Sequence, residues 1–341
     1  MRAGRESWPD VLLGGLGHAL PGGVVESAEV ERELGLPTGW IERRTGVRRR
    51  CVASPGEATS DLALAAGSAA LADAGLGGAD LGLLILATSS PDHTLPPTAP
   101  LVAHGLGSSC GAVDLGGACA GFLYGLGLGA GLVQTTGRAV LLVAANVLSR
   151  RSDPSDAGTL GLFADAAGAV VLVHRGTAGG GRGRAGLVES LILASQGEHY
   201  GTIGIEAGGS RLPLDAEGLA RRAHLMRMHL GPRVFRAAVQ GMVRTGRAAL
   251  EAAGVGAENV DLWVPHQANV RITQEVGRRL GLDAGRSVSV IEEHGNSSAA
   301  SIPLAMSLAR GAGRLTPGSG QRLLLTGFGA GLLEGAAVVR V

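Results

Sequence analysis

The stretch DLGGACAGFLYGLGLGAG, residues 114–131, decides how this 341-residue sequence is interpreted. It places Cys119 where apolar, strand-like residues give way to Gly and Ala at the start of an expected helix. Two interpretations compete. A free cysteine is usually a small buried hydrophobe. A cysteine at a helix N-terminus lies in a field that favours the thiolate, which is the nucleophilic form. Taken alone, the stretch favours the buried, unreactive cysteine.

Composition limits the class of protein. Hydrophobic residues make up 45% and charged residues 17% of the chain, which indicates a globular protein rather than a disordered one. A net charge of +1 and 3% aromatic residues argue against nucleic-acid binding. We see no leader segment and no apolar run that approaches membrane-spanning length. Three cysteines are too few for a disulfide framework or a zinc site, so we expect a reduced, cytoplasmic protein without a metal.

The chain repeats itself once. Three pairs of segments are similar: 69–90 with 248–269, 137–150 with 320–333, and 167–175 with 334–341. In the first pair, both segments read as the end of a helix, a short turn and then an apolar strand. In the last pair, both read as a strand that closes its half. A Gly/Arg-rich connector, residues 175–186, separates the copies. The sequence therefore predicts an α/β fold with two similar halves, residues 1–176 and 177–341.

A duplicated α/β chain tends to place a site where its halves meet. Cys119 follows an expected strand of the first half. In the second half, His266 ends the strand of VPHQANVRI, and Asn296 lies in HGNSSAASIPLA. Ligands bind at the carboxyl ends of strands in α/β folds. A cysteine with a nearby His and Asn is typical of acyl transfer through a covalent thioester, so this juxtaposition favours a reactive Cys119.

Two glycine-rich segments need separate interpretations. GFGAGL, residues 327–332, is either a tight turn that requires positive φ or a backbone that approaches an oxyanion, and the two are equally favoured. GLGLGAG, residues 125–131, lies inside the helix that Cys119 begins and is not a dinucleotide-binding loop. A further helix, residues 234–253, has its apolar residues on one face.

The sequence resembles the thiolase-fold condensing enzymes, and most closely β-ketoacyl-acyl-carrier-protein synthase III. The resemblance depends on DLGGACAGFLYGL, LFADAAGAVVL, VPHQANVRI, HGNSSAASIPLA and GFGAG, with WIERRTGVRRR near the start. These motifs occur in family order over nearly the whole chain. They imply a five-layered αβαβα fold with two pseudo-symmetric halves and a homodimer.

The resemblance also implies a reaction. Cys119 becomes the acylated nucleophile, with its pKa lowered by the helix N-terminus, and His266 and Asn296 complete the triad. Malonyl on an acyl carrier protein then loses carbon dioxide. His266 and Asn296 stabilise the resulting enolate, whose carbon attacks the Cys119 thioester. The backbone N–H groups of Cys119 and Ala330 form the oxyanion hole. No tightly bound cofactor is implied, only acyl-CoA or acyl-phosphopantetheine as substrate.

Contacts to coenzyme A or pantetheine are implied at six positions. These are Trp40, Arg44, Gly231, Phe235, Asn269 and Arg271. A second, adenine-stacking Arg of the family is replaced by Ala157, which weakens the case for a CoA donor and favours carrier-protein delivery. Leu95, from the dimer partner, and Phe328 line the implied acyl pocket. Residues 208–228 match the family poorly near the substrate entrance, and we expect new specificity there.

Other functions remain open at this stage. The enzyme could instead pass the Cys119-bound acyl group to an alcohol or amine, with His266 as general base. It could also be a non-catalytic partner of a ketosynthase, although such subunits lack the active cysteine. The basic run RRTGVRRR, residues 43–50, is either a solvated face or a rim for phosphate or an acidic carrier protein. The acyl group and the pathway, fatty-acid or polyketide biosynthesis, are not fixed.

Overall fold

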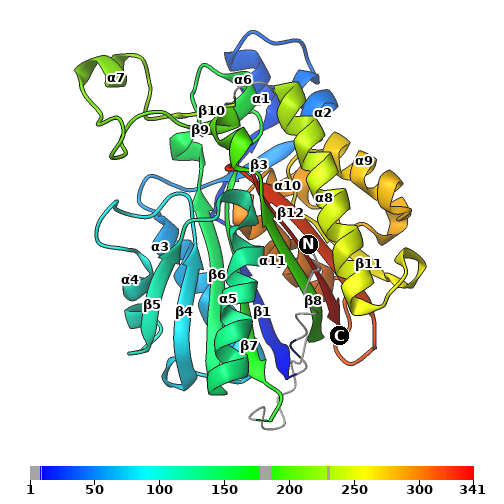
Figure 1. Ribbon diagram of the computed structural model, residues 1–341. Coiled ribbons are helices and arrows are strands. Elements are labelled where there is room, and N and C mark those ends of the chain that lie inside the picture. The colour runs from blue at the N-terminus through cyan, green and yellow to red at the C-terminus, as the bar shows by residue number, and fades with distance from the viewer. Residues whose placement is uncertain (1–7, 9, 177–185, 229–230) are drawn as a thin grey trace.

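The computed structural model describes residue 8 and residues 10–176, 186–228 and 231–341. Its largest element is a nine-stranded sheet in the order β11-β12-β13-β8-β1-β7-β6-β4-β5 (Figure 1). The strands of this sheet are β1 (Val11–Ala19), β4 (Leu81–Ala87), β5 (Gly111–Leu115), β6 (Ala139–Val147), β7 (Asp165–His174), β8 (Gly186–Ser195), β11 (Leu262–Pro265), β12 (Arg322–Gly329) and β13 (Leu333–Arg340). Two short hairpins pair β2 (Gly23–Glu26) with β3 (Arg49–Val52), and β9 (Ile203–Ile205) with β10 (Met226–Met228).

Eleven α-helices are found among the described residues. They are α1 (Ser27–Glu33), α2 (Trp40–Thr45), α3 (Thr59–Ala74), α4 (Ala99–Gly105), α5 (Gly121–Thr136), α6 (Ala157–Leu160), α7 (Ala216–Ala220), α8 (Gly231–Ala253), α9 (Val270–Leu280), α10 (Ile291–His294) and α11 (Ser301–Gly311). Two single-turn 3-10 helices, η2 (Ala118–Ala120) and η7 (Ser298–Ala300), lead directly into α5 and α11.

The packing confirms the predicted αβαβα layers. Helices α3 and α4 pack on the outer face of the first-half strands, where Ala66 and Val102 join one buried cluster. Helices α8 and α9 do the same for the second half. Between the two groups of strands lie α5 and α11, whose Phe122 and Ile302 share a third cluster with strands of both halves. Among the described residues, two residue pairs of β1 and β8 join the two groups at their edges.

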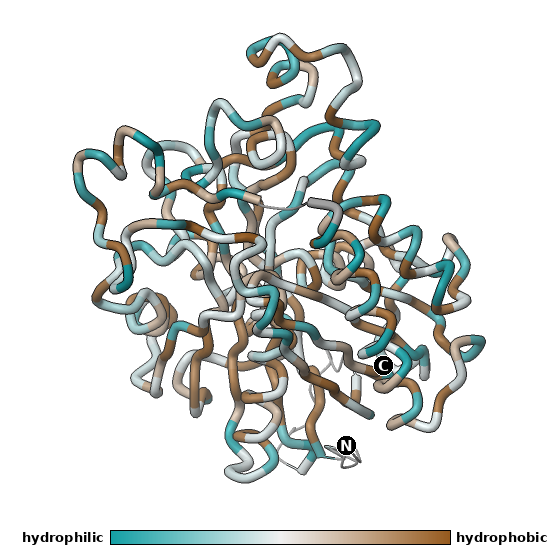
Figure 2. Tube along the Cα trace, turned by 45° about the horizontal axis from the view of Figure 1, so that its top comes forward, coloured by the Kyte–Doolittle hydropathy of each residue, from teal (hydrophilic) through white to brown (hydrophobic). Residues whose placement is uncertain are grey.

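The strand pairing repeats between the halves, as the similar segments predicted. In the first half, β4 pairs in parallel with β6, and β6 pairs antiparallel with β7. In the second half, β11 pairs in parallel with β12, and β12 antiparallel with β13. The buried strands read as continuous apolar runs because helices cover both of their faces. In Figure 2 these strands are mainly brown, whereas the colour alternates along the outer helices.

Helix α5 corrects one expectation. Among the described residues, the helical stretch Ala118–Thr136 is long and apolar enough to cross a membrane by length and composition, although we expected no such run. Here it packs between the two groups of strands and shares a buried cluster with strands of both halves. Its glycines allow this close packing: a Cβ at Gly125 would lie 2.4 Å from Leu142 Cδ1, and one at Gly129 would lie 2.8 Å from Leu172 Cδ1. The run 125–131 is thus a packing surface inside the helix.

Helix α8 has the predicted one-sided apolar face. Six predicted positions are buried in its core cluster, and Phe235 is partly buried against it; the six are Val234, Ala238, Val239, Met242, Val243 and Leu250. Elsewhere, the segment between β9 and β10 forms an arm that carries α7 away from the body (Figure 1). The region of poor family match, residues 208–228, therefore comprises this projecting arm and β10.

Candidate active site

Residues from both halves meet at one cavity of about 380 Å³. Cys119, His266 and Asn296 all contribute to its wall, as the sequence predicted. Cys119 lies between β5 and α5, whereas His266 directly follows β11. The cavity thus lies where the carboxyl ends of strands in both halves converge.

Cys119 is held in η2, behind a residue in an unusual conformation. Ala118 has a φ of +43°, in the left-handed region that non-glycine residues rarely adopt. The Cys119 side chain is partly buried, and its sulfur accepts a hydrogen bond from Ser298 Oγ at 3.2 Å. Ser298 also has a positive φ, +57°. The thiol therefore lies at the contact between the two halves.

The protonation state of Cys119 differs from the prediction. Burial raises the pKa of the Cys119 thiol above its usual value, although hydrogen bonds from Ser298 Oγ and from the Cys119 backbone N–H lower it. The prediction that the helix N-terminus lowers the pKa of Cys119 is wrong. Removal of the sulfur from water outweighs the nearby hydrogen bonds. The thiol is protonated at rest.

His266 is a neutral, fixed imidazole. Its backbone N–H donates to the Thr326 carbonyl at 2.7 Å, which continues the β11–β12 pairing by one residue. Its Nδ1 lies 2.7 Å from Ser301 Oγ, and its ring packs edge-on to Phe328 with centroids 5.8 Å apart. Burial lowers the pKa of His266 to about 3. The imidazole is therefore uncharged near neutral pH.

Asn296 is held by main-chain and side-chain hydrogen bonds. Its N–H donates to the Leu162 carbonyl, and its own carbonyl accepts from Ala164 N–H, both at 3.0 Å. The side-chain Oδ1 accepts from Ser298 N–H at 2.9 Å, and Nδ2 donates to the Ala268 carbonyl at 3.4 Å. Because Oδ1 takes an N–H, the amide group of Asn296 is oriented and its second Nδ2 proton stays available to the cavity.

The glycine-rich turn has the positive φ that one of its two interpretations requires, and the oxyanion interpretation stays a prediction. A Cβ at Gly329 would lie 2.8 Å from the backbone nitrogens of Cys119 and Ala120, so this position requires the absence of a side chain. Gly331 provides the positive φ, +128°. Between them, Ala330 contributes to the cavity wall beside Cys119. The turn therefore lies directly against the backbone of the cysteine segment.

Trp40 and Arg44 form a stacked pair in the cavity wall. The Arg44 guanidinium carbon lies 4.2 Å from the Trp40 ring centroid. Asn269 fixes this segment, because its Nδ2 donates to the Arg44 carbonyl at 2.9 Å. Phe235 and Phe328 also contribute to the wall. Four of the six predicted CoA or pantetheine positions, and one of two acyl-pocket positions, thus line this cavity.

Three other predicted residues lie outside this set. Arg271 is exposed at the start of α9, and its backbone N–H donates to Asn269 Oδ1 at 2.9 Å. Leu95 is 83% exposed in the single chain. Gly231 begins α8, next to residues 229–230, which lie outside the described residues. Their roles stay predictions.

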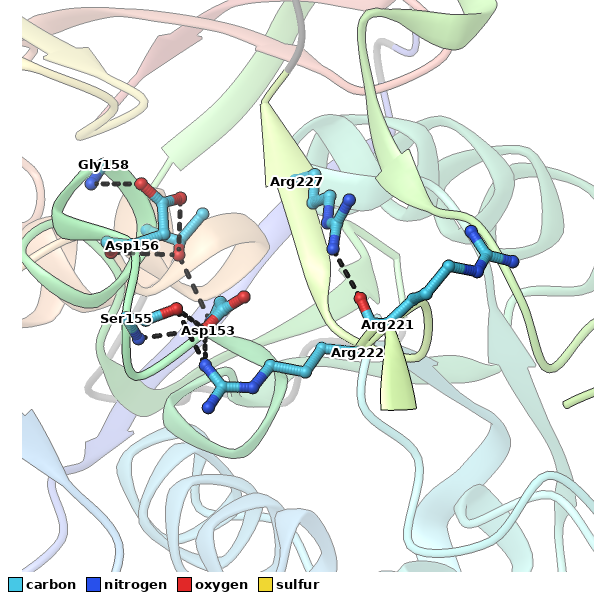
Figure 3. A network of polar contacts seen from close by, with 8 residues as sticks. Asp153, Ser155, Asp156, Gly158, Arg221, Arg222 and Arg227 are labelled. Atoms are coloured by element: carbon cyan, nitrogen blue, oxygen red, sulfur yellow. Dashed lines mark hydrogen bonds and ion pairs between the residues drawn. The ribbon is translucent and has the colours of Figure 1, made fainter. Parts of the chain in front are cut away.

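A polar network fixes the loop that carries Ala157 and Gly158, both in the cavity wall (Figure 3). Asp156 Oδ1 accepts from Gly158 N–H at 2.9 Å. Asp153 Oδ1 accepts from Ser155 at 2.7 Å and from Arg222 Nη1 at 2.7 Å. A hydrogen bond from the Ser155 backbone N–H, followed by these two side-chain hydrogen bonds, holds the pKa of Asp153 below its usual range. Arg222 belongs to the projecting arm, so the network ties that arm to the cavity, where β10 contributes Met226 and Met228.

The basic run 43–50 has no single role. Arg44 stacks on Trp40, and Arg48 and Arg49 pair with Glu293 on α10. Arg50 is buried and donates to the Leu160 carbonyl at 2.5 Å. Part of the run is therefore structural, which neither simple interpretation anticipated.

Two serines of the site had no assigned role in the sequence. Ser298 contacts Cys119, and Ser301 contacts His266. Both lie in NSSAAS, next to Asn296, so the motif indicated that they are close to the site in sequence. The pairing with a cysteine 179 positions away had no signal in a single sequence.

Comparison with known proteins places this geometry among condensing enzymes. The sequence profile for 3-oxoacyl-[acyl-carrier-protein] synthase III matches residues 113–187, and that for its C-terminal region matches residues 250–341. Two relatives are named 3-oxopimeloyl-[acyl-carrier-protein] synthase. The Rhodothermus marinus protein is 51% identical over 96% of this chain and 92% of its own length. The Brucella abortus protein is 45% identical over 96% and 98%.

A solved structure shows the same architecture. The crystal structure of 3-oxoacyl-(acyl carrier protein) synthase III from Pseudomonas aeruginosa superimposes with a TM-score of 0.86 at 38% identity. The match covers 97% of this chain and 98% of that one. Sequence and structure therefore agree over nearly the full length of the chain.

Proposed function

This chain belongs to the 3-oxoacyl-[acyl-carrier-protein] synthase III family of thiolase-fold condensing enzymes, and we propose that its donor is a five-carbon acyl thioester with a free terminal carboxylate. The family membership makes it a ketosynthase III-like acyltransferase that condenses an acyl group with malonyl carrier protein. The cavity with Cys119, His266 and Asn296 in its wall supports this reaction, and the names of the relatives support the choice of donor.

The choice of donor follows from carbon balance. The relatives at 51% and 45% identity are named for a 3-oxopimeloyl product, a seven-carbon chain with carboxyl groups at both ends. Decarboxylative condensation with malonyl supplies carbons 1 and 2. The donor therefore supplies carbons 3 to 7, including the far carboxylate, and its thioester carbon becomes the 3-oxo group. A glutaryl thioester meets this requirement.

We assign the first half-reaction to Cys119. Its sulfur forms a bond to the donor carbonyl carbon, and the bond from that carbon to the donor thiol breaks. The Cys119 proton leaves with the departing thiol. Because burial raises the pKa of Cys119, ionisation accompanies donor binding rather than preceding it. Cys119 and Ala330 line the same cavity, and their backbone N–H groups form the oxyanion hole in this assignment.

We assign the second half-reaction to the neutral imidazole and the amide. The bond between the malonyl methylene and its carboxylate breaks, carbon dioxide leaves, and the electron pair forms an enolate. His266 Nε2–H and Asn296 Nδ2–H donate to that enolate oxygen. The enolate carbon then attacks the Cys119 thioester, and the thiolate leaves and is reprotonated. Removal of one such donor lowers the rate by about 10²–10³.

Several wider features belong to the same proposal. The substrate arrives on an acyl carrier protein or CoA, and Ala157, in the same cavity wall as the Trp40–Arg44 stack, favours the carrier protein. The exposed Leu95 is proposed to cap the acyl pocket of a homodimer partner. We retain the division into halves 1–176 and 177–341, the contacts at Gly231 and Arg271, and a cytoplasmic location as proposals.

Intact-mass spectrometry tests the donor. The protein is incubated with glutaryl, acetyl, succinyl and adipyl groups, each on CoA and on carrier protein. We expect a glutaryl mass increase that is lost in Cys119→Ala, and a seven-carbon 3-oxo product after malonyl carrier protein is added. Preferential loading of acetyl would contradict the donor but not the family reaction.

A second experiment separates condensation from acyl transfer to an alcohol or amine. The Cys119→Ala variant retains His266 and Asn296, so it is expected to release carbon dioxide from malonyl carrier protein. An enzyme that uses His266 only as a general base for an acceptor would release none.

A further inference from the structure

His266 and Ser301 form a buried pair behind the cavity. Both are 1% exposed, and His266 Nδ1 lies 2.7 Å from Ser301 Oγ. Ser301 is the first residue of α11, and its Oγ also accepts a hydrogen bond from Gln267 N–H at 3.2 Å. The serine hydroxyl therefore already has one donor directed at it from the backbone next to the histidine.

The positions of the protons follow from the available acceptors. Among the residues that the structure describes, His266 Nδ1 is the one acceptor within hydrogen-bond distance of the Ser301 hydroxyl proton. If Nδ1 carried a proton, Ser301 Oγ would receive two donors, and its own buried proton would be unpaired. If Nδ1 is unprotonated, Gln267 N–H donates to Oγ and the Ser301 O–H donates to Nδ1. Only the second arrangement pairs each proton, as buried polar groups require.

A second observation agrees. A backbone hydrogen bond with Ser298 raises the pKa of His266 against the larger lowering by burial, which is the effect of a carbonyl that accepts a ring N–H. Since Ser301 occupies Nδ1, this effect agrees with a ring proton on Nε2.

We propose that Ser301 is a positioning residue that keeps the single ring proton of His266 on Nε2, the ring nitrogen that Ser301 does not contact. This inference rests on the proposed function. It adds the reason why the histidine acts as a hydrogen-bond donor: an Nε2 that already carries a proton donates to the enolate oxygen. The same Nε2 does not remove a proton from an alcohol or amine, so the tautomer also favours condensation over acyl transfer by general-base catalysis.

Nitrogen NMR of the full-length protein tests the tautomer directly. Histidine labelled with ¹⁵N in the ring distinguishes protonated from unprotonated nitrogens, and the His266→Asn variant identifies the signals of His266 among nine histidines. We expect an unprotonated Nδ1 and a protonated Nε2 near neutral pH. A protonated Nδ1 in the wild-type protein would overturn the inference, whatever the activity.

Two serine variants on α11 test the cause. Ser301→Ala removes the hydroxyl donor, so the His266 signals should show a mixture of both tautomers. In the Cys119→Ala background, release of carbon dioxide from malonyl carrier protein should fall about 10-fold, less than the 10²–10³ expected when the donor itself is lost. Ser301→Thr, which retains a hydroxyl, should restore part of this rate.

Ser307→Ala is the matched control. Ser307 lies on the same helix, and its Oγ lies 2.8 Å from Nδ1 of another histidine, His18. It removes the same kind of pair without touching the cavity, so the His266 signals and the rate should not change. If Ser301→Ala keeps a pure Nε2–H tautomer, the role of Ser301 is refuted. If the protein loads no donor and releases no carbon dioxide, the proposed function fails, while the wild-type spectrum still decides the tautomer.

Discussion

Ala118 and Ser298 occupy equivalent positions in the two halves of the fold, and both have left-handed backbone angles, with φ of +43° and +57°. Each begins a single-turn 3-10 helix, η2 or η7, that leads into a helix of the central layer. Such a conformation at a non-glycine residue costs about 1 kcal/mol and persists only where the surroundings enforce it. Here it brings Ser298 Oγ to within 3.2 Å of Cys119 Sγ.

Ser298→Ala should make Cys119 less reactive. The Ser298 hydroxyl favours the thiolate, so its removal raises the pKa of Cys119 further. A hydrogen bond to a charged group contributes about 1.5 kcal/mol, which corresponds to about one pH unit. Alkylation by iodoacetamide, followed by mass spectrometry across pH, should therefore shift to higher pH by about one unit.

Cys51 provides an internal control in the same sample. Burial raises the pKa of Cys51 to about 11, so its alkylation should stay slow in both proteins. Ser298→Gly separates the hydroxyl from the backbone strain: it loses the donor but accepts the positive φ readily. It should shift the Cys119 profile as Ser298→Ala does. An unchanged profile in both variants would remove Ser298 from the ionisation of Cys119.

Much of this architecture could be predicted because the internal repeat and the hydrophobic pattern are both visible in short stretches of the sequence. The similar segments 69–90 and 248–269 predicted the equivalent strands β4 and β11, and the end of β11 predicted the place of His266. The apolar residues on one face of residues 234–253 predicted helix α8. Each of these predictions depends on short-range periodicity, which a single sequence records well.

The remaining features depend on long-range contacts that no local pattern records. The net pKa of Cys119 depends on how deeply the sulfur is buried, and its neighbours suggested the opposite direction. Helix α5 is as apolar as a membrane-spanning helix because strands of both halves pack against it. The positioning of Ser301 against His266 joins residues 35 positions apart through the packing of α11 behind β11.

His266 should make the protein less stable in mild acid. Its pKa is about 3 in the folded state against an ordinary 6.5, so between these values the unfolded chain binds a proton that the folded chain does not. The free energy of unfolding therefore falls as pH drops below about 6.5. At pH 5 the loss attributable to His266 is about 2 kcal/mol. Urea unfolding at pH 7.5 and pH 5 measures it.

The matching variants are His266→Asn and His93→Asn. His266→Asn should reduce the pH dependence by about 2 kcal/mol. His93 is exposed, and its replacement should leave the difference between the two pH values as it is in the wild type. Equal pH dependence in all three proteins would mean that His266 is protonated freely in the folded state.

Ala157→Arg should improve binding of CoA donors. Ala157 and Trp40 line the same cavity, and the loop that carries Ala157 is fixed by Asp153 and Asp156. A guanidinium near an aromatic ring contributes about 1 kcal/mol of binding free energy, which corresponds to a KM that is lower by about fivefold. We expect that decrease in KM for acyl-CoA, with no change for the same acyl group on a carrier protein, whose arm has no adenine. Ala157→Gln, long but uncharged, is the control, and an equal gain with Gln would exclude the cation–π explanation.

Gly329→Ala should slow acylation strongly. The new Cβ would lie 2.8 Å from the backbone nitrogens of Cys119 and Ala120, closer than real Cβ atoms come to other heavy atoms. The turn and the cysteine segment must separate, which displaces the Ala330 N–H from the Cys119 N–H in the proposed oxyanion hole. Loss of such a donor lowers the rate by about 10²–10³, measured as the initial rate of mass gain at Cys119.

Gly131→Ala on α5 is the matched control, because nothing lies within 4 Å of its Cβ and alanine favours the helix by about 1 kcal/mol. That variant should be more stable in urea and load at the wild-type rate. Normal loading by Gly329→Ala would show that the turn does not set the oxyanion geometry.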